Sequence, residues 1–413
     1  MRFRTLSEWL TWIKTLHPVE MDLSLERVTE IAKRLHLLNP AYTVVTVAGT
    51  NGKGSCVAGL EAIYLAAGYQ VGAFTSPYLF QYNEQVRIQG IAVDDDDFCQ
   101  AFEKVADACQ EITLTPFEFT ALAAFVIFQQ ANLDIVILEV GLGGRWDAVN
   151  VMDADVALVT SIAIDHAAIL GNTREEIGRE KSGIFRKNKP VVCGDFDPPL
   201  SIINHAADLS SPIFCQGREF KFIDEKNSWT WQSEKNKFEN LPLSFLALQN
   251  MSTVLMAVEL LQEKFPITRN TIDRALSTVN LPGRIQIIPG DVTQIFDVSH
   301  NPAAAEFLVN KLRHQSCNGK TRAVFSMLAD KDIVSTISIM DELIDEWFVA
   351  PLAVPRGASH SVLTESFQKA AIKNVASHAM IAEAYQAAMN KSVIGDRVIV
   401  FGSFHTVSGV LKN

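Results

Sequence analysis

The sequence of 413 residues lacks the signatures of several broad classes of protein. Its six cysteines include no C-x-x-C pair and no regular spacing, so we expect buried or idle thiols in a reducing compartment rather than a disulfide framework. Positive charge is scarce, since the net charge is −11, and the overall electrostatics do not favour nucleic acid or an anionic membrane surface. An anionic substrate would need local positive charge, which a divalent cation could supply.

Long apolar segments are also absent. The run at residues 121–128 is far shorter than the roughly 20 residues that a membrane-spanning helix needs. Residues 1–16 mix charged side chains among apolar ones at helical spacing and lack the unbroken apolar stretch of a signal peptide. The composition, 48% hydrophobic and 20% charged, is typical of a globular protein. We therefore expect a soluble, cytoplasmic protein without nucleic-acid or membrane partners.

What is present is an alternation of short β-branched runs and helical periodicities. Runs typical of buried strands occupy residues 43–48, 135–139, 156–160 and 191–193. Helical patterns occupy residues 53–67, 97–111, 117–131 and 174–182. Such alternation favours a largely parallel sheet with helices on its faces. The carboxylates at residues 94–97 fit the start of a helix, where the helix dipole favours negative charge.

The pattern changes after the first α/β series. Residues 220–241 show short polar and aromatic alternation, which indicates a small antiparallel sheet, and helical patterns follow at 250–264 and 270–279, with Asn270 as the expected N-cap. Leu281-Pro282-Gly283-Arg284 breaks the second helix. A second α/β series follows, with strands expected at residues 294–297, 323–327, 347–350 and 397–401. We therefore expect two α/β domains: residues 1–283, with a phosphate loop and a parallel sheet flanked by helices, and residues 284–413, a smaller Rossmann-like domain.

The segment Gly49-Thr50-Asn51-Gly52-Lys53-Gly54-Ser55 stands between the first predicted strand and its helix. Glycines let backbone N–H groups approach phosphate oxygens, and the helix start adds partial positive charge. Lys53 can neutralise β- and γ-phosphate oxygens, and the Ser55 hydroxyl is placed for phosphate or Mg²⁺. The spacing departs from the usual phosphate-loop pattern, because only two residues separate Gly49 from Gly52. A Gly-rich turn without a ligand is the alternative, but a lysine among three glycines favours phosphate binding.

Several long motifs, spread in order over nearly the whole chain, resemble those of the folate branch of the Mur ligase superfamily. They are MDLSLERV at 21–28, TVAGTNGKGS at 46–55, FTSPYL at 74–79, LTPFEF at 114–119, VILEVGLGGRWDAVN at 136–150, TSIAIDH at 160–166, GREKSGIFR at 178–186, LPGR at 281–284, FDVSHNP at 296–302, MLADKD at 327–332 and FGSFHTV at 401–407. The resemblance implies that ATP phosphorylates a carboxylate and that an amine attacks the acyl phosphate, giving an amide, ADP and phosphate. It further implies that the amine is L-glutamate and the acid is dihydropteroate or a reduced folate, so that dihydrofolate and folylpolyglutamates are the products.

The resemblance also implies a metal site. Glu139 ends a predicted strand, and the carboxyl ends of parallel strands face the crevice where such sheets bind ligands. By resemblance, Ser76, Glu139 and His166 hold Mg²⁺. Two such ions are expected, and K⁺ or another monovalent cation is a further candidate cofactor. Lys181 is expected to be carbamylated, so that its anionic group serves the metal. Without the resemblance, His166 would be read as a structural histidine and Lys181 as an exposed helix lysine.

The expected ATP site combines both domains. By resemblance it comprises Gly49 to Ser55, with Asn250 for adenine, Arg284 for phosphate and Asp297 for ribose. His300 and His405 are candidates for the glutamate side, and each could equally be a structural histidine. The residues expected to act in catalysis are Lys53, Glu139, His166, Lys181 and His300.

The pteroate-like substrate is expected to occupy a pocket in the first domain. By resemblance the pocket is formed by Asp22, Thr115, Pro116, Phe117, Glu118, Trp146, Asp147 and Ala148. Phe117 could stack on the pterin and Asp22 could accept hydrogen bonds from ring amino groups, whereas core packing is the alternative for Phe117. Two positions depart from the family pattern. Tyr78 stands where histidine is usual, so we do not expect a histidine to transfer a proton at that position. Trp146 replaces a small aliphatic residue, so we expect a reshaped or partly closed pocket.

Three alternative functions remain open at this point. A folylpolyglutamate synthase without dihydropteroate activity would share these motifs. A peptidoglycan Mur ligase normally carries a further N-terminal domain, for which a chain beginning so near the phosphate loop leaves little space. An inactive nucleotide-binding regulator is expected to lack Lys53, Glu139 or His166, and all three are present. We expect an enzyme that acts as a monomer on small-molecule substrates.

Overall fold

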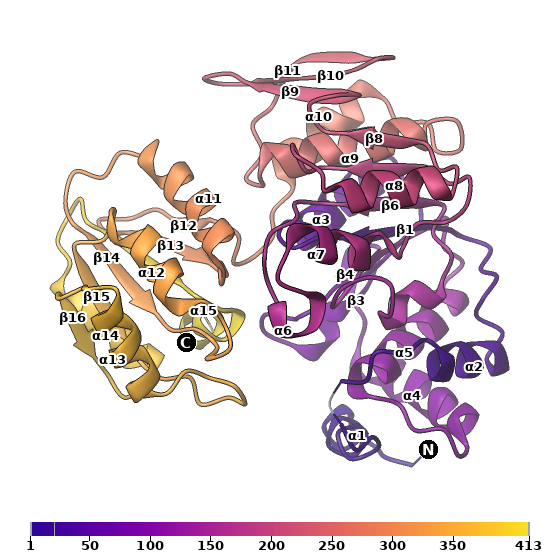
Figure 1. The fold of residues 1–413 in the computed structure, drawn as a ribbon, viewed down its shortest axis with the longest axis horizontal. Coiled ribbons are helices and arrows are strands. Elements are labelled where there is room, and N and C mark those ends of the chain that lie inside the picture. Colours follow the sequence, from indigo (N-terminus) through magenta and orange to yellow (C-terminus); the bar gives the residue numbers. More distant parts are fainter. Residues whose placement is uncertain (1, 20, 412–413) are drawn as a thin grey trace. The chain divides into compact units, whose positions relative to one another are not determined.

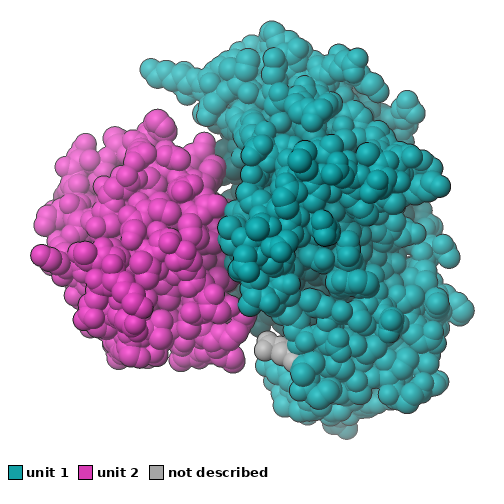
Figure 2. Space-filling view, in the orientation of Figure 1, with its two compact units in different colours: residues 1–280 teal, residues 281–413 magenta. Residues whose placement is uncertain are grey.

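The chain forms two compact α/β units. The computed structural model describes residues 2–19 and 21–411, and it divides at residue 280 into units of residues 1–280 and 281–413 (Figure 2). Each unit contains one large, mostly parallel sheet with helices packed on it (Figure 1), which confirms the expected fold class. In the part of the chain that is described, no helix is both long and apolar enough to cross a bilayer.

The large sheet of the first unit has eight strands in the order β4-β3-β2-β5-β1-β6-β7-β8. From β2 to β8 all neighbours in this order are parallel, and β3 and β4 add an antiparallel edge beside β2. The strands are β1 Thr43–Ala48, β2 Val71–Phe74, β3 Val86–Ile88, β4 Ile91–Ala92, β5 Ile135–Glu139, β6 Val156–Val159, β7 Val191–Cys193 and β8 Ile213–Cys215.

The helices of the first unit pack on this sheet and on one another. Helix α3 packs against β1, β2 and β5, whereas α5 packs against β2 and against α4. The helices are α1 Leu6–Ile13, α2 Glu26–Arg34, α3 Lys53–Ala66, α4 Asp95–Cys109, α5 Pro116–Gln130, α6 Ala167–Leu170, α7 Arg174–Ser182, α8 Leu200–Asp208, α9 Leu248–Leu260 and α10 Arg269–Thr278, with short 3-10 helices η1 Tyr82–Gln85 and η2 Ala148–Val151. Central strands such as β1 are buried at every position, as a sheet covered on both faces requires.

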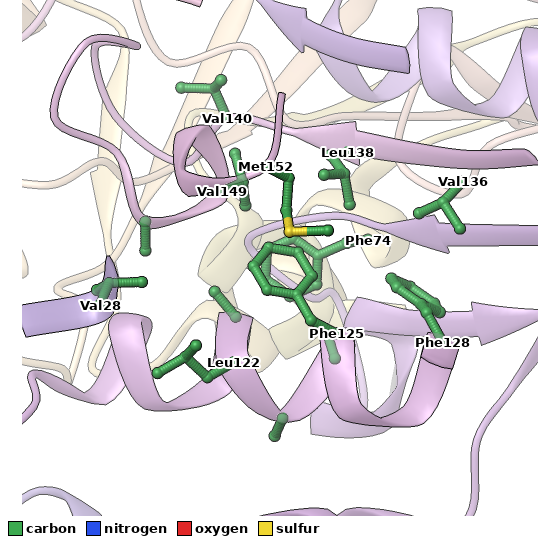
Figure 3. Packing of buried hydrophobic residues seen from close by; sticks show 14 of the residues in the cluster. Val28, Phe74, Leu122, Phe125, Phe128, Val136, Leu138, Val140, Val149 and Met152 are labelled. Carbon is green, nitrogen blue, oxygen red and sulfur yellow. The ribbon is translucent and has the colours of Figure 1, made fainter. Parts of the chain in front are cut away.

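A close-packed core fixes the orientation of β5. Leu122, Phe125 and Phe128 of α5 meet Leu138 and other alternate residues of the strands in a fully buried cluster (Figure 3). Successive side chains of a strand point to opposite faces. Because Leu138 points into this core, Glu139 points to the opposite face, where α3 packs.

The small antiparallel sheet expected at residues 220–241 is confirmed. Its strands are β9 Phe220–Asp224, β10 Trp229–Ser233 and β11 Lys237–Leu241, in the order β11-β10-β9. Trp229 and Trp231 are fully buried, and the indole N–H of Trp231 donates to the Ser252 carbonyl of α9 at 3.1 Å. The indole contact therefore anchors this sheet to a helix of the first unit.

Two helix starts differ in their agreement with the sequence. Asp94 caps α4 and accepts a hydrogen bond from the Asp97 N–H at 2.8 Å, which confirms that the acidic run opens a helix. The expectation that Asn270 caps α10 is wrong, because Thr268 is the N-cap and accepts from the Thr271 N–H. Threonine and asparagine are both good caps, and the backbone is already helical at Arg269, one residue before Asn270.

The second unit has a six-stranded sheet in the order β12-β13-β17-β14-β15-β16. All pairs are parallel except β12 with β13. The elements are β12 Gln286–Ile288, β13 Thr293–Asp297, α11 Pro302–Arg313, β14 Thr321–Phe325, α12 Ile333–Asp341, β15 Glu346–Val349, α13 His360–Lys369, β16 Val375–Ser377, α14 Ile381–Lys391, β17 Arg397–Phe401 and α15 Phe404–Leu411. A separate apolar core that includes Phe325, Trp347 and Phe401 supports this sheet.

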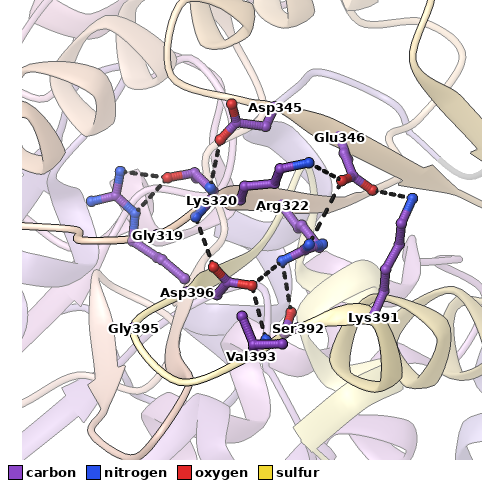
Figure 4. A network of polar contacts seen from close by, with 12 residues as sticks. Gly319, Lys320, Arg322, Asp345, Glu346, Lys391, Ser392, Val393, Gly395 and Asp396 are labelled. Carbon is purple, nitrogen blue, oxygen red and sulfur yellow. Dashed lines mark hydrogen bonds and ion pairs between the residues drawn. The ribbon is translucent and has the colours of Figure 1, made fainter.

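A buried ionic network lies where β14, β15 and β17 begin (Figure 4). Arg322 contacts Asp396 at 2.5 Å and Glu346 at 3.6 Å, and all three side chains are almost fully buried. Asp396 also accepts from the Lys320 and Val393 N–H groups at 2.7 and 2.9 Å. The network therefore joins three strand starts of the second sheet.

Truncating Asp396 should strongly destabilise the second unit. The change Asp396→Ala leaves Arg322 buried without its nearest counter-charge, which we expect to lower the free energy of unfolding by about 3 kcal/mol or more. The exposed pair of Arg313 and Glu342 is the control, because Glu342→Ala should cost about 1 kcal/mol or less. Urea unfolding measures both values, and equal effects of the two changes would contradict a special role for the buried network.

Candidate active site

Four loops leave one edge of the first sheet side by side. Strands β2, β5, β1 and β6 are neighbours and run parallel, so their carboxyl ends share that edge. The segments that follow them are residues 75–79, 140–147, 49–52 and 160–166. Parallel sheets bind ligands at this edge. The expected phosphate loop and the expected metal ligands thus belong to adjacent segments of one edge.

The phosphate loop is held in a shape that two glycines permit. Gly49 has a φ of +139°, and a Cβ there would lie 1.8 Å from the Thr160 hydroxyl oxygen. Gly52 has a φ of +93° and ends the loop as the N-cap of α3, where a Cβ would lie 2.5 Å from Oδ1 of Asn250. Lys53, Gly54 and Ser55 form the first turn of α3. Because the N-cap residue is Gly52, no side chain of the N-cap accepts a hydrogen bond from the N–H groups of that turn. The loop therefore has the geometry of an anion site, with Asn250 next to it.

Two lysine side chains meet at the Gly49 carbonyl. Nζ of Lys53 donates to the carbonyl oxygens of Gly49 and Thr50 at 3.1 and 3.2 Å, and Nζ of Lys181 donates to the Gly49 oxygen at 2.9 Å. Lys181 comes from α7 and is buried. Burial and the nearby Lys53 charge lower the pKa of Lys181 to about 7. Lys181 is thus a buried amine beside the phosphate loop and not an exposed helix lysine.

Ser76 and Glu139 lie next to each other, as the pairing of β2 with β5 requires. The Ser76 N–H donates to Oε2 of Glu139 at 3.3 Å, and Glu139 is buried. Its negative charge contributes to raising the pKa of the Cys56 thiol on α3, after burial as the main cause. The Glu139 carboxylate therefore faces the helix that begins at Lys53.

His166 follows β6 on the other side of the phosphate loop. Its backbone has a φ of +52°, and its N–H donates to the Asp165 carboxylate at 2.8 Å. The preceding residues pair with the phosphate loop, since the Thr50 N–H donates to the Ser161 carbonyl at 2.7 Å. The phosphate loop therefore fixes the start of the segment that leads to His166.

The side chains at this edge suit a hard divalent cation that keeps other ligands. Within residues 2–19 and 21–411, no three His, Cys, Asp or Glu side chains form a metal-binding group by themselves. Mg²⁺ is usually held by one or two carboxylates together with waters and substrate phosphates. A buried carboxylate at Glu139 with the hydroxyl of Ser76 beside a phosphate loop matches that pattern, so the residues present fit such an ion.

The residues expected around pteroate form a connected group beside β5. Arg27 donates to Asp22 at 2.7 Å and to Glu118 at 2.8 Å, and Glu118 forms a capping box with Thr115 at the start of α5. Pro116 is the first residue of that helix. The ring of Phe117 is so close to Gly141 that a Cβ on the glycine would lie 2.6 Å from it. Phe117 therefore contacts the loop that follows Glu139 and also packs on the core.

The three remaining pteroate candidates differ in exposure. Asp147 is buried and accepts from the Leu142 and Val149 N–H groups at 2.8 and 3.0 Å, so its carboxylate organises the loop after β5. Burial raises the pKa of Asp147 to about 6. Ala148 is buried next to it, whereas the Trp146 side chain is 46% exposed. Of these three, Trp146 presents the largest free apolar surface to a ligand.

The candidates in the second unit gather where β13 and β17 end. Asp297 is buried and accepts from the Ile285 and Ser299 N–H groups, both at 2.8 Å. The Arg284 guanidinium lies over the Phe404 ring, 5.2 Å from its centre. His300 follows Asp297, with Nδ1 2.9 Å from the Val298 carbonyl oxygen, and His405 is exposed in the first turn of α15. These four residues therefore belong to one edge of the second sheet.

Two residues near the site were not expected from the sequence. Arg27 forms hydrogen bonds with both Asp22 and Glu118, and the Thr160 side chain packs directly against Gly49. Arg27 lies inside the motif MDLSLERV and Thr160 begins TSIAIDH, so the motifs marked the segments but not these contacts. Contacts across such distances in sequence need the fold to be known.

Comparison with known proteins places the chain among the Mur ligases. Residues 47–238 match the model of the Mur ligase middle domain, and residues 283–404 match that of the Mur ligase glutamate ligase domain. The dihydrofolate synthase/folylpolyglutamate synthase of Escherichia coli is 43% identical over 407 residues, which cover 98% of this chain and 95% of the relative.

Solved structures give the same result. The Escherichia coli protein FolC in complex with DHPP and ADP has a TM-score of 0.95 and 42% identity, covering 99% of this chain and 97% of that one. A bifunctional folylpolyglutamate synthase/dihydrofolate synthase with Mn, AMPPNP and L-glutamate bound has a TM-score of 0.93 and 44% identity, covering 99% and 98%. The chain belongs to the dihydrofolate synthase/folylpolyglutamate synthase family of Mur ligases.

Proposed function

We propose that this chain uses ATP to join L-glutamate to dihydropteroate and to reduced folates. A carboxylate oxygen of the acid attacks the γ-phosphorus of ATP, and ADP leaves. The amino group of glutamate then attacks the acyl carbon, phosphate leaves, and the nitrogen loses a proton to give the amide. The relatives support these substrates, since solved ones hold ADP with DHPP or AMPPNP with Mn and L-glutamate.

The carboxyl edge of the first sheet carries the proposal. A Gly-rich loop, two lysine side chains and a buried carboxylate meet there, in the arrangement that phosphoryl transfer needs. In this role the phosphate loop and Lys53 bind and orient the triphosphate. Ser76, Glu139 and His166 would hold a divalent cation, Mg²⁺ or Mn²⁺, which supplies charge stabilisation to the phosphate oxygens when bound. Two such ions and a supporting monovalent cation such as K⁺ are part of the proposal.

Lys181 is proposed to be carbamylated. The neutral amine attacks the carbon of CO₂, a nitrogen–carbon bond forms, and the nitrogen loses a proton to leave an anionic carbamate. Two observations support this: Lys181 is buried, and its amine shares a carbonyl oxygen with Lys53. An ammonium in that place would face another cation, whereas a carbamate would pair with Lys53 and serve the metal.

Replacing Lys181 tests the modification. We expect Lys181→Met to lower turnover by about 100-fold or more, because an anion is lost from the phosphate-transfer site. Since the pKa of Lys181 is lowered to about 7, its amine is protonated below that pH, and the carbamate should then be lost. Above that pH, added bicarbonate should restore turnover. Carbon-13 NMR of protein equilibrated with labelled bicarbonate should show a carbamate signal that Lys181→Met lacks. The matched control is Lys187→Met, which changes an exposed lysine. The modification would be ruled out if Lys181→Met kept normal turnover and the native protein gave no carbamate signal.

The remaining nucleotide and glutamate contacts are assigned by chemistry. Asn250 lies against the phosphate loop and carries an amide suited to adenine. The Arg284 guanidinium suits phosphate, and the Asp297 carboxylate suits the ribose hydroxyls. Asp297 already accepts hydrogen bonds from two backbone N–H groups, so only part of its acceptor capacity is left for ribose. His300 and His405 are proposed for the glutamate side.

The acceptor acid is proposed to bind beside β5. Asp22, Phe117 and Trp146 would contact the pterin, and Thr115 to Glu118 and Asp147 to Ala148 would shape the pocket. Incubation with ATP, Mg²⁺, glutamate and dihydropteroate should give ADP and a glutamylated product. If only tetrahydrofolate is extended, the function is that of a monofunctional folylpolyglutamate synthase, and ATP binding without product would favour an inactive regulator. We further propose that the protein is cytoplasmic, acts as a monomer and has small molecules as its partners.

A further inference from the structure

The segment that carries His166 is held from one side by the phosphate loop. The Thr50 hydroxyl donates to the Ala163 carbonyl at 3.0 Å and accepts from the Ala163 N–H at 3.1 Å. The Ser161 hydroxyl donates to the Asn51 carbonyl at 3.2 Å. These contacts fix residues 161 and 163 relative to the triphosphate site.

An ion pair holds the same segment from the other side, at the residue between those two. Oδ2 of Asp195 accepts from the Ile162 N–H at 2.6 Å, and Nε of Arg174 donates to the Ile162 carbonyl at 3.0 Å. Arg174 and Asp195 also contact each other at 3.1 Å. Both polar backbone groups of Ile162 are therefore bound by one ion pair, whose members come from α7 and from the loop after β7.

The chain beyond Ile162 needs such restraint. Ile164 is 54% exposed, so apolar packing holds it only in part. His166 adopts a φ of +52°, a conformation uncommon for residues with a Cβ, and such conformations persist where the surroundings determine them. The fixed segment from Ser161 to Ala163 is thus the support from which the chain extends to His166.

We propose that Arg174 and Asp195 are positioning residues for the divalent cation and act through Ile162 on His166. The inference rests on the proposed role of His166 as a metal ligand. Residues that orient metal ligands are usually side-chain partners of those ligands, and here the restraint acts on the main chain. Helix α7 then serves the site at both ends, since Arg174 holds the histidine segment and Lys181 reaches Gly49.

Binding of Mn²⁺ tests the proposal without turnover. Free Mn²⁺ is measured by electron paramagnetic resonance in the presence of AMPPNP, with wild type, Asp195→Asn and Arg174→Lys. Asp195→Asn removes the charge at constant shape and should weaken Mn²⁺ binding by about tenfold, the lower end for residues that support metal ligands. Arg174→Lys keeps the charge but loses the fork that reaches Ile162 and Asp195 together, so a smaller loss is expected. The matched control is Glu175→Gln, because Glu175 accepts from the Leu200 and Ser201 N–H groups and holds α8.

Turnover gives the second measurement. If positioning is the role, the Mn²⁺ concentration at half-maximal rate rises in parallel with the loss of binding, and saturating Mn²⁺ restores most of the maximal rate. Unchanged Mn²⁺ binding in both variants, or an equal loss in Glu175→Gln, would overturn the proposal. Should a variant unfold at the assay temperature, the Mn²⁺ titration is repeated below its unfolding midpoint, and Arg174→Lys provides the milder change. Failure of wild type to make a glutamylated product would overturn the proposed function and leave the Mn²⁺ comparison valid.

Discussion

Replacing Lys53 with alanine should abolish turnover while the chain stays folded. The ammonium of Lys53 stands at the loop where the β- and γ-phosphates are proposed to bind, and removing such a preorganised charge typically lowers kcat by about 10²–10³-fold. A second effect adds to the first, because the Lys53 charge helps to lower the pKa of Lys181. Without it, more of the Lys181 amine is protonated near neutral pH and less is available to react with CO₂.

The measurements for Lys53→Ala separate chemistry from folding. Product formation from dihydropteroate and from tetrahydrofolate should fall together, since both reactions pass through the same phosphoryl transfer. Circular dichroism and urea unfolding should remain close to wild type, because Lys53 donates to loop carbonyls and not to the core. Lys104→Ala, at an exposed lysine of α4, is the control and should keep full activity. A near-normal rate in Lys53→Ala would refute the role given to this lysine.

Glu139→Ala should have an effect of similar size for a different reason. The change removes the negative charge proposed to hold the divalent cation, and the loss of a metal ligand should lower turnover by about 100-fold or more at ordinary metal concentrations. Glu139→Gln, which keeps the shape and an acceptor for the Ser76 N–H, tests charge alone and should be nearly as inactive. Measuring rate against Mg²⁺ concentration distinguishes this from loss of nucleotide binding.

A carboxylate elsewhere in the same unit provides the comparison for Glu139. Glu259 of α9 accepts from the Ser233 hydroxyl and the Asn236 amide at 2.8 and 2.6 Å, away from the carboxyl edge of the sheet. Glu259→Gln should lower stability slightly and leave the Mg²⁺ dependence unchanged. If Glu139→Gln behaves like Glu259→Gln, with normal turnover and an unchanged Mg²⁺ requirement, the metal assignment is wrong.

The sequence predicted the central elements well because their patterns are strong. The strands at residues 43–48, 135–139, 191–193 and 397–401 and the helix at 174–182 match the structure at both ends. Each of these strands is buried at every position, and continuous burial leaves a clear apolar run. Weaker patterns gave no prediction, as for β2, whose four residues include Gly72, and for α8, whose outer face carries the exposed Leu200.

The site was predictable as a set of residues but not as an arrangement. The motifs named the residues, whereas strand order decides which of them meet. Because β5 enters the sheet between β1 and β2, Glu139 stands next to both Ser76 and the phosphate loop. The contact of Lys181 with Gly49 joins residues 132 positions apart, and no local pattern carries such information. The pairing of Asp195 with the histidine segment was missed for the same reason.

The outermost strands of both large sheets share a property that bears on how this chain behaves when crowded. They are β4 with two residues and β8, β12 and β16 with three each, whereas β1 at the centre has six. An outer strand offers unpaired N–H and C=O groups to any other chain. Because these strands are short, another chain can form only a few backbone hydrogen bonds with them. We therefore expect the folded protein to resist edge-to-edge aggregation at high concentration, although each sheet contains long apolar strands in its interior.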